Sequence, residues 1–154
     1  ILEDPKAVQN LSLGLIEGFL RTWDLHAYRQ DQAFYIPFDY SLNSDREMQM
    51  LIAVSGPHHS QLEVTFESDT RISRERFPEA LAFCNRYNHE RNGLKAALVI
   101  PKNQEGQPAA SGKLRAWMHL DLLMGIHADL LNALLAEALG DAWIFWRLAQ
   151  EEGL

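Results

Sequence analysis

The sequence predicts an α+β fold: a two-layer domain in which an antiparallel, five-stranded sheet carries helices on one face, in the order α-β-β-β-α-β-β-α. In three segments, apolar residues recur at helical spacings of three and four. In five further segments they alternate with polar residues, as in strands that bury one face. The chain has 154 residues, 47% of them hydrophobic, which is enough for one core and calls for no second domain.

The first helix is expected to start at Asp4 and Pro5, which are good residues for an N-cap and a first helical position. Its apolar face is defined by residues at three- and four-residue spacings, and it ends near Leu25. The residues of this face are Val8, Ser12, Leu15, Ile16, Phe19 and Trp23.

The spacing then changes to two, which predicts three strands at residues 33–40, 47–54 and 61–67. A polar turn at residues 41–46 joins the first two, and the turn SGPHHS precedes the third. Pro37 has no N–H to donate, so the first strand is predicted to lie at an edge of the sheet.

The second helix is predicted from Pro78 to the stop signal at Asn92 and Gly93. Two more strands follow at residues 94–100 and 114–120, with a loop at residues 101–112 between them. The last helix is predicted over residues 128–149, and Gly140 is expected to lie inside it without breaking it.

Helices on a single side leave the second face of the sheet partly uncovered. By alternation, the residues expected on this face include Tyr35, Leu51, Val99 and Trp117. If their strands are neighbours, the four form an apolar patch, and we predict a protein-binding surface there, most simply a homodimer interface. The alternative is that the sheet curls and a terminus or the loop at residues 101–112 covers Trp117.

Two asparagines, Asn85 and Asn88, lie in the second helix, although asparagine is a poor residue for a helix interior. On a helical wheel Asn88 shares a narrow sector with Phe77, Leu81 and Cys84, which predicts that it is buried, with Asn85 at the margin. An unpaired buried carboxamide costs ~1–3 kcal/mol, so we predict a structural role in which it bonds backbone groups of an adjoining strand or turn. A ligand role is the alternative.

Several segments together resemble the YbjN-type family, whose members are proposed bacterial sensory-transduction regulators with a fold similar to the type III secretion chaperones. The segments are NRYN, GLKAALVI, KLRAWMHL and MGIHADLLNALLAEALGDAWIFW. The resemblance covers roughly residues 11–149 and rests on hydrophobic spacing, on Asn85 and Asn88, and on Gly125 and Ile126 before the last helix. It implies one YbjN-like domain over residues 1–154 and a chaperone-like or regulatory binding role.

Trp117, His119 and Asp121 alternate along the fifth strand, so an imidazole and a carboxylate point the same way about 7 Å apart. Such a pair could begin a metal or acid/base site, but zinc needs three or four ligands and no HExxH or CxxC spacing supplies them. The sequence also lacks GxSxG, P-loop and GxGxxG motifs. We therefore predict no catalytic residue, no bound metal and no cofactor.

Three further histidines and the cysteine are read as structural. His58 and His59 are expected in a turn and His127 near the start of the last helix, while Cys84 is read as a small core residue because no lysine or arginine shares its face. A lone cysteine cannot form an internal disulfide, which fits a cytoplasmic location.

The net charge of −7 makes a nucleic acid an unexpected partner, and no apolar run is long enough to cross a membrane. The favoured hypothesis is a non-enzymatic, cytoplasmic protein-interaction module, chaperone-like or regulatory, whose partner is another protein or a second copy. The alternative is a small-molecule-binding protein or a cryptic enzyme with a cavity between the sheet and the last helix. A flat apolar patch would favour the first, and a large dry pocket with convergent polar groups the second.

Overall fold

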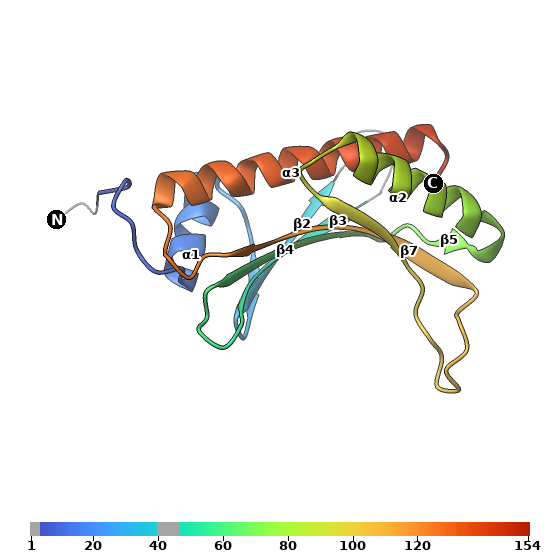
Figure 1. The fold of residues 1–154 in the computed structure, drawn as a ribbon, viewed down its shortest axis with the longest axis horizontal. Helices are drawn as coiled ribbons and strands as arrows, with labels where there is room; N and C mark the ends of the chain where they lie inside the picture. Colours follow the sequence, from blue (N-terminus) through green and yellow to red (C-terminus); the bar gives the residue numbers. More distant parts are fainter. Residues whose placement is uncertain (1–3, 40–46) are drawn as a thin grey trace.

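The computed structural model describes residues 4–39 and 47–154 and has the predicted α+β architecture, with helices along one side of an antiparallel sheet (Figure 1). In the view of Figure 1, α3 and α2 lie above the sheet, and α1 packs against α3 at one end. The elements are α1 (Leu13–Thr22), β1 (Tyr28–Gln30), β2 (Ala33–Asp39), β3 (Glu47–Ser55), β4 (Gln61–Ser68), β5 (Ile72–Ser73), the 3-10 helix η1 (Arg74–Arg76), α2 (Phe77–Glu90), β6 (Lys95–Val99), β7 (Ser111–Asp121) and α3 (Ala128–Glu151).

The sheet has seven strands in the described part of the chain, so the prediction of five was wrong. Its order is β1-β2-β3-β4-β7-β5, and β6 pairs with β7 beside this path. The two unpredicted strands, β1 and β5, have only three and two residues, and β1 is exposed throughout. Segments of this length cannot show an alternation of apolar and polar residues, so no sequence pattern predicts them.

Pro37 lies at a position where β1 does not need a hydrogen bond from its missing N–H. In β2 only Ala33, Phe34 and Tyr35 pair with β1, and Pro37 lies beyond this pairing, opposite Gln49 of β3. At Pro37 the strand β2 therefore forms the edge of the sheet, as predicted. Next to the first residues of β2, the short strand β1 extends the sheet. The predicted turn at residues 41–46 lies outside the described residues.

The first helix begins at Leu13 and not at Pro5, so its predicted start was wrong. Ser12, which the wheel placed on the buried face, is the N-cap, and its hydroxyl accepts a hydrogen bond from Leu15 N at 3.2 Å. Before it, Gln9 forms a bridge with Ile126, with backbone N···O distances of 3.0 and 2.8 Å. This pairing holds the backbone extended, so Asp4 and Pro5 make only a turn. The helix ends at Thr22, ahead of Asp24, which has a positive φ of 50°.

The remaining elements follow the sequence pattern closely. Pro78 stands in the first turn of α2, β6 and β7 fall within two or three residues of their predicted bounds, and α3 runs without interruption across Gly140. The loop between β6 and β7 contains its own short bridge between Lys102 and Pro108. Figure 1 shows this loop projecting from the sheet on the side away from the helices.

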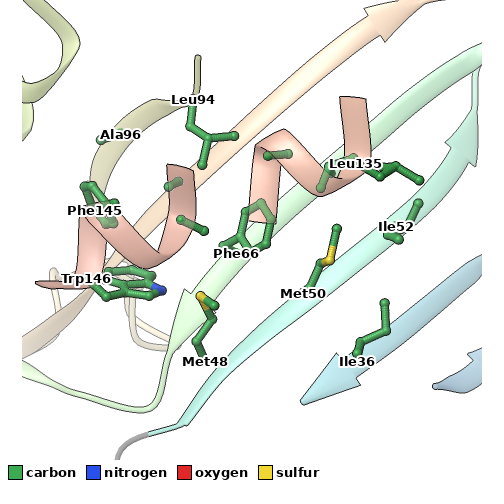
Figure 2. Close-up of a cluster of buried hydrophobic side chains, with 14 of the residues drawn as sticks. Ile36, Met48, Met50, Ile52, Phe66, Leu94, Ala96, Leu135, Phe145 and Trp146 are labelled. Carbon is green, nitrogen blue, oxygen red and sulfur yellow. The ribbon is translucent and has the colours of Figure 1, made fainter. Parts of the chain in front are cut away.

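The core fills the space between α3 and the sheet (Figure 2). Alternate residues of β2, β3 and β4 point toward α3, while Phe145 and Trp146 reach back from the helix. Phe145 also meets Tyr87 of α2 edge to face, with ring centroids 4.9 Å apart, which joins the two helices in one layer. The labelled residues of this cluster in the three strands are Ile36, Met48, Met50, Ile52 and Phe66, all buried.

No helix among the described residues is both long and apolar enough to cross a lipid bilayer.

Candidate functional site

The face of the sheet that carries no helix, called the open face below, brings three of the four predicted binding residues into one line. Tyr35 pairs with Leu51 on the neighbouring strand. Leu51 pairs with Thr65, and Thr65 pairs with Trp117. Paired residues of neighbouring strands have Cβ atoms about 4.5–5.5 Å apart on the same face. The line continues to Tyr28 of β1, which pairs with Tyr35, and we call these five residues the central row.

Val99, the fourth predicted residue, does not belong to this row. It pairs with Lys113, whereas Lys95 pairs with Trp117, so the two positions lie ~13 Å apart along β6. Both Val99 and Trp117 nevertheless line one hollow of about 370 Å³ on the open face. The other residues that line this hollow are Glu63, Thr65, Ala97, Arg115, Met118 and His119.

The open face is less apolar than the predicted patch. Tyr35, Leu51, Val99 and Trp117 are all half-buried, because polar side chains stand on both sides of the central row. Glu63 and His119 pair on one side, and Glu67 and Arg115 pair on the other. The hollow beside Trp117 is open to solvent, and the residues that line it belong to strands. The face is thus a narrow apolar row between polar margins.

Charge divides the open face into two halves. On β2, β3 and β4 the charged side chains of this face are acidic, and on β6 and β7 they are basic except for Asp121 at the end of β7. Where the halves meet, Arg115 Nε donates to Glu67 Oε1 at 2.6 Å. By strand alternation and pairing, the acidic residues are Asp39, Glu47, Glu63 and Glu67, and the basic residues are Lys95, Lys113 and Arg115.

Tyr28 is the member of the central row that the sequence did not indicate. Its side chain is 73% exposed, unlike those of the four predicted residues. The segment YRQ is exposed throughout and carries no alternation, so only its pairing with Tyr35 reveals that it extends the row.

Asn88 bonds an adjoining strand, as expected. Its Nδ2 donates to the carbonyl oxygen of Ala96 at 3.0 Å, and Ala96 N donates to its Oδ1 at 2.7 Å. The outer side of β6 is an edge of the sheet, so the carboxamide supplies the partners that a further strand would otherwise provide.

The expected burial of Asn88 was wrong, because the helical wheel selected the wrong sector. Asn85 and Asn88 are both exposed, and Leu81 is 50% exposed. The side of α2 that is buried carries Ala80, Phe83, Cys84 and Tyr87. Aromatic contacts with α3 decide this orientation, since Phe83 lies 5.3 Å from Phe145 between ring centroids. The four residues of the buried side also recur at spacings of three and four in the sequence, so the pattern of α2 did offer this side as well.

Cys84, His58, His59 and His127 have the surroundings of structural residues. Burial raises the pKa of the Cys84 thiol to about 11, which disfavours the reactive thiolate at neutral pH. His58 and His59 are exposed in the turn between β3 and β4. His127 is the N-cap of α3, where its Nδ1 accepts a hydrogen bond from Leu130 N at 3.0 Å.

His119 and Asp121 make separate contacts and no joint site. His119 Nε2 lies 3.2 Å from Gln61 Oε1, whereas Asp121 Oδ1 accepts a hydrogen bond from Leu123 N at 3.1 Å. Across residues 4–39 and 47–154, no three side chains of His, Cys, Asp or Glu are grouped so that they could hold a metal ion.

Comparison with known proteins gives an informative similarity, and it is structural. No protein-family model matches the sequence, and no curated protein matches it. Among solved structures, YbjN from E. coli, described as a proposed transcription regulator, superposes with a TM-score of 0.73 at 12% sequence identity. The alignment covers 96% of this chain and 98% of the YbjN chain. The protein therefore has a YbjN-like fold, as the sequence resemblance implied.

Proposed function

We propose that the protein is a non-enzymatic regulatory module that binds another protein through its open face, most simply a second copy of itself. The observation that carries this proposal is the central row, which aligns Tyr28, Tyr35, Leu51 and Trp117 on the face without helices. Aromatic residues supply much of the affinity at protein interfaces because each buries a large area with little loss of conformational freedom. The YbjN-like fold, seen in a protein proposed to regulate transcription, supports a regulatory role.

The charge pattern favours a second copy over an unrelated partner. A two-fold axis parallel to the strands would place the acidic half of one protomer over the basic half of the other. It would also place Tyr35 of one protomer over Trp117 of the other, next to the hollow of about 370 Å³. Opposite charges at such an interface set its orientation, and the apolar row contributes most of the affinity.

A small-molecule site between the sheet and α3 has less support. Most of the space between them is filled by buried side chains (Figure 2). The hollow that remains between β7 and α3, at about 280 Å³, lies at the edge of the sheet and is smaller than the usual ligand pocket. The hollow on the open face, at about 370 Å³, is near the lower end of the usual range of ligand pockets and is wide open. The open face thus resembles a docking surface more than an active site.

Light scattering tests the proposal. We expect a dimer at high micromolar concentration, and we expect Trp117→Glu to dissociate it while circular dichroism still shows a folded protein. Tyr28→Ala, at an exposed position of the row, provides a second variant with little risk to folding. Leu81→Glu is the matched control, because Leu81 is an exposed apolar residue on the helical side.

A wild-type protein that stays monomeric at high micromolar concentration would rule out the homodimer. Affinity purification from the native cell, with mass spectrometry of the bound proteins, then tests for a different partner. A partner that wild type and Leu81→Glu retain equally, and that both Trp117→Glu and Tyr28→Ala lose, would place that partner on the open face.

A further inference from the structure

The strand β7 is longer than its neighbour β6, and this leaves part of its edge unpaired. The strand β6 begins at Lys95, opposite Trp117, and runs away from the end of β7. The last residues of β7, 118–121, therefore pair with β4 on one side but with no strand among the described residues on the other. In Figure 1 the yellow strand β6 accordingly flanks only the part of β7 that is nearer the projecting loop.

The backbone groups at this free edge point outward. Ala96 uses its N–H and C=O to bond Asn88 on the outer side of β6, so these groups point away from β7. The direction of the backbone N–H and C=O groups alternates from residue to residue along a strand. The neighbours Lys95 and Ala97 therefore point these groups toward β7, where they pair with Trp117 and Arg115. By the same alternation, His119 and Asp121 direct their N–H and C=O groups to the side where β6 has ended.

A hollow of about 280 Å³ lies directly beside this edge, between β7 and α3. Its floor is apolar, and Met118 and Leu120 contribute to it from β7 because their side chains face the helices. The apolar residues that line it are Leu94, Trp117, Met118, Leu120, Leu134 and Ala138.

The rim of this hollow is acidic on the side of α3. Glu137 and Asp141 stand one helical turn apart and both line the hollow, while Lys95 lines it from β6. Burial and the neighbouring charge of Glu137 raise the pKa of Asp141, and Arg91 opposes this effect. Two carboxylates close enough to repel each other next to an apolar hollow favour an incoming cation.

We propose that the free edge of β7 binds an extended peptide segment of a partner protein by strand addition, with an apolar side chain in the hollow and a lysine or arginine beside Glu137 and Asp141. The backbone of the peptide would bond His119 and Asp121, which gives affinity that depends little on sequence. Alternate side chains would enter the hollow, which gives specificity. A segment paired with residues 118–121 spans ~13 Å.

This site is separate from the proposed dimer interface. The strand edge and the hollow under α3 lie beside the sheet, whereas the central row lies on its open face. The failure of one proposal would therefore leave the other standing, although Trp117, Met118 and His119 line both hollows.

The test is a titration of the protein, labelled with nitrogen-15, with the peptide Lys-Thr-Leu-Thr-Lys, followed by NMR and amide hydrogen exchange. In an extended peptide its leucine and lysines share one face. We expect the amide signals of His119 and Asp121 to shift and their exchange to slow. The peptide Glu-Thr-Leu-Thr-Glu, and a version of the first peptide with methylated backbone nitrogens, are expected to bind at least about tenfold more weakly.

Two substitutions at one residue separate backbone pairing from side-chain contact. His119→Pro removes the outward N–H without breaking a bond to β4, so we expect it to abolish binding in a folded protein. His119→Ala keeps the N–H and is expected to bind like wild type. Glu137→Lys, at an exposed position on α3, is expected to weaken binding about tenfold.

Three results would overturn the proposal. The first is that the amides of His119 and Asp121 are unchanged at millimolar peptide. The second is that the acidic and basic peptides bind equally. The third is that these amides are already protected in the free protein in a concentration-dependent way, which would mean that a second copy occupies the edge.

Discussion

Replacing Asn88 by alanine tests how the edge strand β6 is held. The side chain makes two hydrogen bonds with Ala96, at 3.0 and 2.7 Å, and both partners belong to the backbone. Alanine keeps the helix and removes both bonds at once. The outer N–H and C=O of Ala96 are then left without a protein partner at a residue that is only 5% exposed.

The expected loss is about 0.5–2.5 kcal/mol in the free energy of unfolding. Each neutral hydrogen bond contributes about 0.5–1.5 kcal/mol, so two contribute about 1–3 kcal/mol. Alanine gains about 0.6 kcal/mol over asparagine in helix propensity, which offsets part of the loss. Poor access of water to Ala96 favours the upper part of this range. For a chain of this size the melting temperature should fall by about 2–4 °C per kcal/mol.

Equilibrium denaturation in urea, followed by circular dichroism, measures the effect. Asn85→Ala is the matched control, because Asn85 is exposed on the same helix, and the gain in helix propensity predicts unchanged or slightly higher stability. If Asn88→Ala and Asn85→Ala have equal stability, the two bonds to Ala96 contribute nothing to the fold. A surface role for Asn88 in binding would then be the better explanation.

Three further predictions concern α3, the cysteine and metals. A Cβ at Gly140 would meet no neighbouring atom within 4 Å, so Gly140→Ala should raise stability by about 0.5–1 kcal/mol, and a loss in urea denaturation would reveal an unseen constraint. The Cys84 thiol, with an ordinary pKa of 9.0 raised to about 11 by burial, keeps its proton in the folded state while the unfolded chain loses it. Stability should therefore fall as pH rises from about 9 to 11, and an unchanged alkaline slope in Cys84→Ser would show that another group is responsible. Purified protein should carry no stoichiometric zinc or iron and should melt at the same temperature with chelator, and one metal per chain in elemental analysis would disprove this.

The sequence by itself determined the elements whose pattern is local and long. Alternation over seven or more residues placed β2, β3 and β4, and a stripe of apolar residues placed α3 across Gly140. In these segments each residue's own polarity decides which way it faces, because a strand or helix buries one side whatever it packs against. The same alternation assigned Tyr35, Leu51 and Trp117 to the open face.

Only the tertiary structure decided the features that depend on a distant segment. The pairing of Gln9 with Ile126 shortened α1, and the position of β6 beside α2 made Ala96 the partner of Asn88. The order of the strands put Tyr35, Leu51 and Trp117 in one row, added Tyr28, and left Val99 apart. It also ended β6 before the end of β7, which leaves the outward backbone groups of His119 and Asp121 without a strand beside them. Local polarity sets the direction of a side chain, but its neighbours depend on strand register and helix packing, which join residues far apart in the chain.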